Sequence, residues 1–286
     1  MRLQTSHKKI LITGANGQLG NALKAVSLDF TEYDYIFASK MMVDITSENA
    51  IKEAIQTYQP DIIINTAAYT AVDAAETNEE EAYLLNEKAV HSLATLCANH
   101  KITLIHISTD YVFDGNSSIP YTETSTPNPQ TVYGKSKLAG EIAIQGIENL
   151  TYAIVRTSWL YSDYGHNFYK TMLRLGIERS NISVVNDQHG IPTFANDLAR
   201  AILRLIPQLD DVSKGVYHYS NTGITTWYAF AKAIFKYSKL DVKVMPVSSK
   251  EYPTAAKRPK YSILDCTKIK KTFEVYCPFW EEALKK

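Results

Sequence analysis

The sequence lacks a net charge and a cysteine framework. Lys plus Arg and Asp plus Glu each total 30, so no overall field draws the protein to nucleic acid or to an anionic membrane. Cys97, Cys266 and Cys277 have no metal-ligand spacing, and an odd number of cysteines argues against a disulfide framework. We therefore expect a protein of a reducing, cytoplasmic compartment without a nucleic-acid partner.

Long apolar runs are also missing. None approaches the roughly 20 residues of a membrane-spanning helix, and residues 1–9 lack the apolar core of a signal peptide. We expect no membrane partner. The chain does have 286 residues, 45% of them hydrophobic, which is enough for a large domain with or without a smaller lobe.

A glycine loop follows the first apolar run. Residues 9–13 predict a buried strand, Gly14, Gly17 and Gly20 follow at once, and residues 21–28 have helical character. Glycines allow a tight turn and a close approach to a pyrophosphate, which the helix N-terminus then attracts. The strand and helix on either side favour a dinucleotide site over a plain glycine turn.

Strands and helices alternate through the first half of the chain. This pattern predicts an α/β fold, a Rossmann-type doubly wound parallel sheet with a smaller C-terminal substrate lobe. We expect a cofactor-binding domain over 8–157 and a mainly substrate-binding lobe over 158–286, with elements that cross back to the main sheet. The further strands are predicted at 35–40, 60–68, 102–109, 152–157, 182–185 and 216–219.

Polar residues after the second strand bear on the cofactor. Many NAD sites have an acid there for the ribose hydroxyls, but this chain has Ser39 and Lys40, a hydroxyl and a cation that suit a 2′-phosphate. The pattern favours or at least tolerates NADPH and leaves NADH open. Asp44 either touches the adenine end or caps the helix predicted over 47–58.

Tyr133 and Lys137 lie four residues apart at the start of a predicted helix, hence on one helical face. A nearby ammonium favours the phenolate, so we expect the pKa of Tyr133 to fall toward the working range. The alternative is a solvated helix face. Thr109 ends the fourth strand, where a parallel sheet presents its ligands, whereas His106 is interpreted as a core residue. Asn86 is either a core hydrogen bonder or a support for the site.

In this order, the glycine loop, the small residues that end the third strand, Thr109 and the Tyr133/Lys137 pair resemble the extended short-chain dehydrogenase/reductases, which act on nucleotide sugars. Longer strings narrow the resemblance to reductases of dTDP-linked 4-keto sugars, over nearly the whole chain. These strings are 67–76, 108–115, 156–161, 167–168, 186–193 and 258–259.

The resemblance implies hydride transfer from NADPH or NADH to the C4 ketone of dTDP-4-dehydrorhamnose. Tyr133 would give the proton, Lys137 would lower the tyrosine pKa and bind the nicotinamide ribose, and Thr109 would bond the ketone oxygen. The implied cofactor residues are Gly14, Gly17, Gln18, Leu19, Gly20, Ser39, Lys40, Asp44, Ile45, Ala67, Ala68, Tyr69, Tyr133 and Lys137. The implied substrate residues are Thr109, Asp110, Tyr111, Trp159, Asn167 and Arg258, the last pairing with the diphosphate.

One position departs from the family pattern. Some members are dimers bridged by a metal through carboxylates, and Ala22 stands where one carboxylate is found, so we expect no metal and either a monomer or a homodimer. Two other functions stay open. One is a reductase or epimerase of another nucleotide 4-keto-6-deoxysugar. The other is a non-enzymatic regulatory subunit of the kind that accompanies methionine adenosyltransferase.

Overall fold

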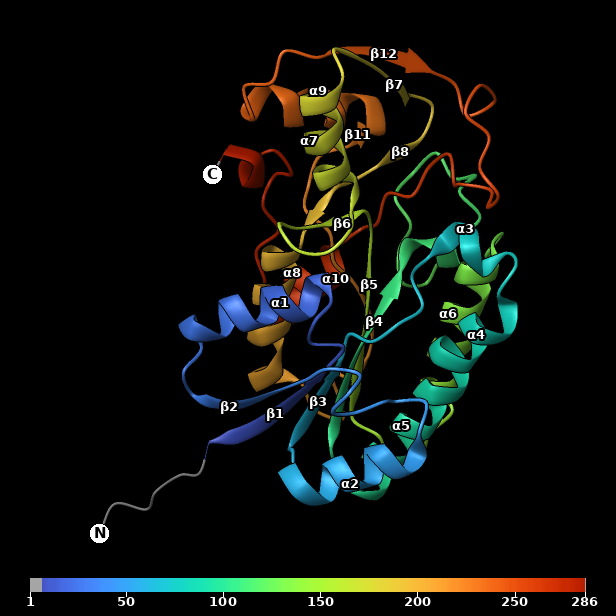
Figure 1. The fold of residues 1–286 in the computed structure, drawn as a ribbon. Helices are drawn as coiled ribbons and strands as arrows, with labels where there is room; N and C mark the ends of the chain where they lie inside the picture. Colours follow the sequence, from blue (N-terminus) through green and yellow to red (C-terminus); the bar gives the residue numbers. More distant parts are fainter. Residues whose placement is uncertain (1–6, 286) are drawn as a thin grey trace.

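The computed structural model describes residues 7–285, and most of the leader, residues 1–6, lies outside them (Figure 1). A six-stranded sheet has the order β10-β5-β4-β3-β1-β2, with every neighbouring pair parallel. This confirms the predicted α/β class. Its strands are β1 (Lys8–Thr13), β2 (Tyr33–Ala38), β3 (Ile62–Asn65), β4 (Thr103–Thr109), β5 (Tyr152–Thr157) and β10 (Gly215–His218).

Three two-stranded ladders lie outside this sheet. They pair β6 (Leu160–Tyr161) with β9 (Thr193–Phe194), β7 (Asn181–Val185) with β12 (Lys243–Val247), and β8 (His189–Gly190) with β11 (Thr225–Thr226). The α-helices are α1 (Gln18–Val26), α2 (Glu48–Tyr58), α3 (Val72–Ala75), α4 (Glu79–Tyr83), α5 (Ala89–Asn99), α6 (Val132–Gln145), α7 (Phe168–Glu178), α8 (Ala195–Leu205), α9 (Trp227–Tyr237) and α10 (Thr267–Phe273). Shorter turns are η1 (Ser27–Asp29), η2 (Leu84–Lys88, a π-helix), η3 (Asp110–Val112), η4 (Ile206–Gln208) and η5 (Glu282–Lys285).

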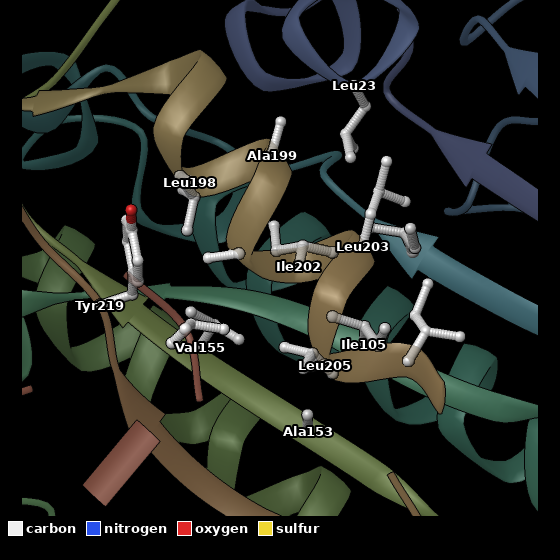
Figure 2. Packing of buried hydrophobic residues seen from close by; sticks show 14 of the residues in the cluster. Leu23, Ile105, Ala153, Val155, Leu198, Ala199, Ile202, Leu203, Leu205 and Tyr219 are labelled. Atoms are coloured by element: carbon white, nitrogen blue, oxygen red, sulfur yellow. The ribbon is translucent and has the colours of Figure 1, made fainter. Parts of the chain in front are cut away.

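The central strands bury both faces, which explains their continuous apolar runs. Successive side chains point to opposite faces, so Ile10 packs with α1 and α8 whereas Leu11 packs with α2 and α5. Figure 2 shows the face of the sheet that α1 and α8 cover, where α8 lies over β4 and β5. Each large aliphatic side chain buried in this way contributes roughly 1.5–3 kcal/mol.

The third strand is shorter than predicted. It ends at Asn65, and residues 66–68 leave the sheet although they continue the predicted run. Thr66 donates its hydroxyl to the Thr13 carbonyl at 2.7 Å, and a Cβ on Gly14 would lie 2.7 Å from the Ala67 nitrogen. Residues 66–68 therefore pack against the glycine loop and do not extend β3.

An aromatic cluster makes up the core of the C-terminal lobe, which we define as α7, α9, the three two-stranded ladders and the segments next to them, including Trp159 and Trp280. Tyr161, Phe194, Phe230 and Trp280 pack together there. The sequence pattern did not predict α7. Because β10, α8 and α10 pack on the main sheet, chain order does not separate the two parts cleanly. The boundary at residue 157 stays a prediction.

Candidate active site

The glycine loop presents an uncapped helix N-terminus. Gly14 has a φ of +67°, which favours glycine, and Gly17 precedes α1 without a side-chain hydrogen bond to the first turn. A Cβ on Gly20 would lie 2.5 Å from the Ala15 backbone, so glycine is also needed to pack helix against loop. Free backbone N–H groups at this end fit a pyrophosphate.

Tyr133 and Lys137 occupy the first turns of α6, beside the end of β4. Thr131 caps the helix by accepting a hydrogen bond from the Gly134 nitrogen at 3.0 Å. A Cβ on Gly134 would lie 2.2 Å from the Tyr111 carbonyl oxygen, so glycine lets α6 approach η3. The helix thereby brings both side chains to the cavity that Thr109 also lines.

Lys137 is buried, with 2% of its surface exposed. Its Nζ atom lies 2.7 Å from the Ile107 carbonyl oxygen and 3.1 Å from His106 Nε2. Burial lowers the pKa of Lys137 to about 8, and the charge of Glu141 opposes this effect. His106 is in the core, as predicted. It also contacts Lys137, a contact that the sequence interpretation missed.

The predicted fall in the pKa of Tyr133 is wrong. Burial raises the pKa, the hydrogen bond with Thr109 lowers it by less, and the charge of Asp110 raises it further. Lys137 is turned to Ile107 and His106, so its charge does not offset the desolvation of the phenol. A raised pKa keeps the proton on Tyr133 at neutral pH, as a proton donor requires.

Asp110 adds a second perturbed group. Burial raises its pKa to about 6, against hydrogen bonds that lower it. Its Oδ1 accepts from the Thr109 hydroxyl at 3.0 Å, and the Ser262 hydroxyl also lowers its pKa. Because Asp110 lines the cavity, its carboxyl group is suited to a ligand hydroxyl.

A cavity of about 880 Å³ joins these groups to the C-terminal lobe. This volume is in the range of ligand sites. The predicted residues that line it are Gly17, Gln18, Leu19, Ala68, Thr109, Asp110, Tyr111, Tyr133, Lys137, Trp159 and Arg258. Those outside the lining are Gly14, Gly20, Ser39, Lys40, Asp44, Ile45, Ala67, Tyr69 and Asn167.

Asn167 does not face the sugar side as expected. Its amide nitrogen donates to Gln18 Oε1 at 2.8 Å, and its oxygen accepts from the Lys170 nitrogen at 2.9 Å to cap α7. Ser162 donates to the same Gln18 oxygen at 3.1 Å. These contacts tie the glycine loop to the chain that leads into the C-terminal lobe.

The residues after β2 form a turn. Asp44 accepts hydrogen bonds from the nitrogen and hydroxyl of Thr46, which lower its pKa, and Ser47 caps α2 in its place. Capping of that helix by Asp44 is therefore wrong. Lys40 is 4.0 Å from Asp44 Oδ2 with an 82% exposed side chain, and remains accessible to a 2′-phosphate.

Arg258 is already paired. It donates to Asp73, whose other oxygen accepts from the Ala256 nitrogen at 3.0 Å, and to the Tyr111 hydroxyl at 3.2 Å. Its side chain lines the cavity and is 24% exposed. A diphosphate would share Arg258 with Asp73 or replace Asp73, a competition that the sequence did not suggest.

Trp159 forms one wall of the cavity and stacks on Trp227, with ring centroids 3.5 Å apart and an interplanar angle of 9°. Its φ of +45° is unusual for a bulky residue. Gln188 accepts a hydrogen bond from Trp227 Nε1 at 3.2 Å. The sequence strings included Gln188 but did not identify Trp227, because the partner lies far along the chain.

Asn86 fits both of its proposed roles. Its amide is bonded to the backbone nitrogen and oxygen of Tyr69, at 2.9 and 3.0 Å, and to the Ser136 hydroxyl at 3.0 Å. It is fully buried in the π-helical turn η2. Asn86 therefore joins the Tyr69 loop to the helix that carries Tyr133.

A metal centre has no support within residues 7–285, where no three His, Cys, Asp or Glu side chains converge. Ala22 itself is fully buried in the core cluster under α1. Over the same residues, no helix is long and apolar enough to span a membrane.

Comparison with known proteins matches the RmlD substrate binding domain family over residues 8–286. A dTDP-4-dehydrorhamnose reductase of Sinorhizobium fredii is 40% identical, over 97% of this chain and 96% of the relative. A dTDP-4-keto-6-deoxy-D-glucose reductase of Streptomyces niveus is 37% identical over 89% and 87%. The crystal structure of the Bacillus anthracis dTDP-4-dehydrorhamnose reductase in complex with NADP has a TM-score of 0.92 at 45% identity, over 97% of both chains.

Proposed function

The chain belongs to the RmlD substrate binding domain family, and on this basis we propose that it is an NADPH-dependent reductase of dTDP-4-dehydrorhamnose. The product is dTDP-β-L-rhamnose, formed by reduction of the C4 ketone. The observation that carries the proposal is the convergence of Thr109, Tyr133 and Lys137 on one large cavity next to an uncapped glycine loop. The identities of the substrate and of the cofactor are inferred from the relatives named above.

The glycine loop fits a dinucleotide, because a side chain at Gly14 would clash with the Ala67 backbone and α1 offers free N–H groups. When bound there, reduced nicotinamide would supply a hydride to C4. Lys137 is the residue placed to hold the nicotinamide ribose. Lys40 is a cation near the end of β2 and would bind a 2′-phosphate. Because only NADPH carries this phosphate, Lys40 would favour NADPH over NADH.

Proton transfer falls to Tyr133. As the C4 carbon accepts a hydride, the carbonyl bond pair moves to oxygen, and the phenol gives its proton to that oxygen. Thr109 would donate a hydrogen bond to the same oxygen and orient the ketone. The phenolate is reprotonated from solvent when the products leave. The phenol is the form present before reaction, since the ordinary tyrosine pKa of about 10 is above neutral pH and burial raises the pKa of Tyr133 further.

Substrate recognition is assigned to other residues that line the cavity. Asp110 and Tyr111 follow β4, and Trp159 stacks on Trp227. Asp110 lines the cavity, where its carboxyl group would accept a hydrogen bond from a sugar hydroxyl. Arg258 pairs with the diphosphate by leaving Asp73, whereas Asn167 acts on the glycine loop through Gln18.

A spectrophotometric assay tests this function. Purified protein with NADPH and freshly generated dTDP-4-dehydrorhamnose should consume the cofactor and yield dTDP-β-L-rhamnose, identified by chromatography and NMR. Parallel reactions contain NADH, to compare the two cofactors. No consumption with either cofactor would refute the reductase assignment.

A second candidate is reduction of dTDP-4-keto-6-deoxy-D-glucose, favoured by the Streptomyces niveus relative. The same assay with that sugar separates the two, since the preferred substrate has the higher kcat/KM. Tightly bound NAD that copurifies with the protein would instead favour an epimerase. The cytoplasmic compartment and the choice between monomer and homodimer remain proposals, tested by cell fractionation and light scattering.

A further inference from the structure

Lys137 ends a buried hydrogen-bond chain that the reaction above does not use. Asn65 Nδ2 on β3 is 3.1 Å from His106 Nδ1 on β4, and His106 Nε2 is 3.1 Å from Lys137 Nζ on α6. The three residues are 1%, 1% and 2% exposed. The protons between these three residues must therefore have acceptors within the chain.

The orientation of the Asn65 amide is set by a backbone donor. Asn65 Oδ1 accepts from the Ala67 nitrogen at 3.2 Å and from the Thr13 hydroxyl at 2.7 Å. A hydroxyl can donate or accept, but the Ala67 N–H can only donate, so the amide oxygen must face it. The amide nitrogen then faces His106 and can only donate to it.

This orientation fixes the tautomer of His106. Because Nδ1 accepts, the proton of the neutral imidazole is on Nε2. The imidazole is neutral because burial holds the pKa of His106 well below its usual value. The Nε2–H group thus points at Lys137 Nζ. An ammonium offers only donors to it, whereas a neutral amine offers a lone pair.

Other charged groups near Lys137 offset the lowering of its pKa only in part. Glu141, one turn further along α6, is the carboxylate that raises the pKa of Lys137. Its oxygens already accept from Arg156 Nε at 2.9 and 3.1 Å, from Arg156 Nη2 at 2.6 Å, and from Ser108. Tyr133 on the same helix is a neutral phenol, and the charge of Asp110 acts on that phenol.

We infer that Asn65 and His106 act as positioning residues that lock the His106 tautomer and thereby favour the neutral amine form of Lys137 over the ammonium. In this state Lys137 donates to the Ile107 carbonyl and accepts from His106 Nε2–H. When Lys137 turns to the nicotinamide ribose it leaves His106 and takes up a proton from solvent. Only this last step rests on the proposed function.

Nitrogen-15 NMR of histidine side chains in the cofactor-free protein tests the tautomer. The molecule contains its own reference: His218 Nδ1 lies 3.0 Å from the Tyr121 carbonyl oxygen, so that nitrogen must donate, and Nε2 faces Arg156. We expect the Nε2–H form for His106 and the Nδ1–H form for His218, assigned with His106→Gln and His218→Gln. An Nδ1–H or doubly protonated His106 would overturn the inference.

Asn65→Asp provides the matched perturbation, because the carboxylate has nearly the same shape and only accepts. One oxygen keeps Ala67 and Thr13, while the other requires a proton on His106 Nδ1. His106 should then switch to the Nδ1–H form and His218 should not change. An unchanged His106 pattern in a folded Asn65→Asp protein contradicts the lock. If that variant fails to fold, the wild-type tautomers still decide the question.

The proton uptake is measured by calorimetry of NADPH binding in two buffers with different ionisation enthalpies, about one pH unit above the lysine pKa. The 2′-phosphate is fully ionised there, since its second pKa is about 6. Wild-type protein should take up most of one proton per cofactor, and Lys137→Met none. Binding without uptake would refute the neutral amine, whereas absence of binding would instead refute the proposed function.

Discussion

The sheet half and the C-terminal lobe hold their functional groups by different means. Lys137 and Thr109 sit at the ends of regular elements and are fixed by buried, directional hydrogen bonds. In the lobe, Trp159 is held by ring stacking on Trp227 and by contact with the Gly190 backbone. Catalytic groups must be held at fixed positions, which buried hydrogen bonds provide. A surface that binds a sugar must have a complementary shape, which the stacked rings provide.

Two contacts join the halves across the cavity. Gln18 of the glycine loop accepts from Asn167, and Arg258 pairs with Asp73. Both pairs combine a residue before position 75 with one beyond position 165. The cavity for cofactor and substrate therefore lies between the sheet half and the C-terminal lobe. We expect mutations in the sheet half to change kcat, and mutations in the lobe to change the KM for the sugar.

The largest effect is expected at Tyr133. Tyr133→Phe removes the proton donor, so kcat should fall by about 10²–10⁴-fold while the Kd for NADPH stays nearly unchanged. Stopped-flow kinetics and fluorescence titration measure the two quantities. Tyr152→Phe, which removes a phenol at the start of β5, is the matched control. Full activity of Tyr133→Phe would mean that another group donates the proton.

The next largest effect concerns the stability of the sheet half. Glu141→Gln leaves Arg156 buried without its carboxylate and should lower the free energy of unfolding by about 3–5 kcal/mol. The exposed Arg174–Glu178 pair on α7 is the control, since Glu178→Gln should cost only about 0.3–0.5 kcal/mol. Urea unfolding of both variants makes the comparison. Equal losses would show that burial of the first pair does not matter.

The sequence predicted the parts of the molecule that follow local rules. Apolar runs and the glycine spacing were enough for β1, β4, β5 and α1, and Tyr133 with Lys137 followed from helical periodicity. The misses have non-local causes. The Trp227 stack, the Asp73 pairing of Arg258 and the turn of Asn167 to Gln18 join positions that only the folded chain brings together. The raised pKa of Tyr133 depends on burial, which spacing alone does not reveal.

Asp110 predicts a pH dependence within the sheet half. Its folded pKa, about 6, is above the ordinary 3.8, so the folded protein binds this proton more tightly. The contribution to stability is complete below about pH 4 and is lost as pH rises toward 6, by about 3 kcal/mol. Asp110→Asn should remove this loss. The difference between the two unfolding curves across pH is the measurement, and parallel curves would contradict the shift.

The smallest effect tests the packing of the lobe. A Cβ on Gly190 would lie 2.2 Å from the Trp159 ring, so Gly190→Ala should displace the indole stack at a cost of about 1–3 kcal/mol. Near-ultraviolet circular dichroism of the stacked indoles and the KM for the sugar should both change, with kcat largely kept. Gly146→Ala, where the nearest atom lies at 3.5 Å, should change neither. If Gly190→Ala instead lowered kcat at unchanged KM, the lobe would position the reacting atoms too, and the division between directional bonds for chemistry and packing for recognition would fail.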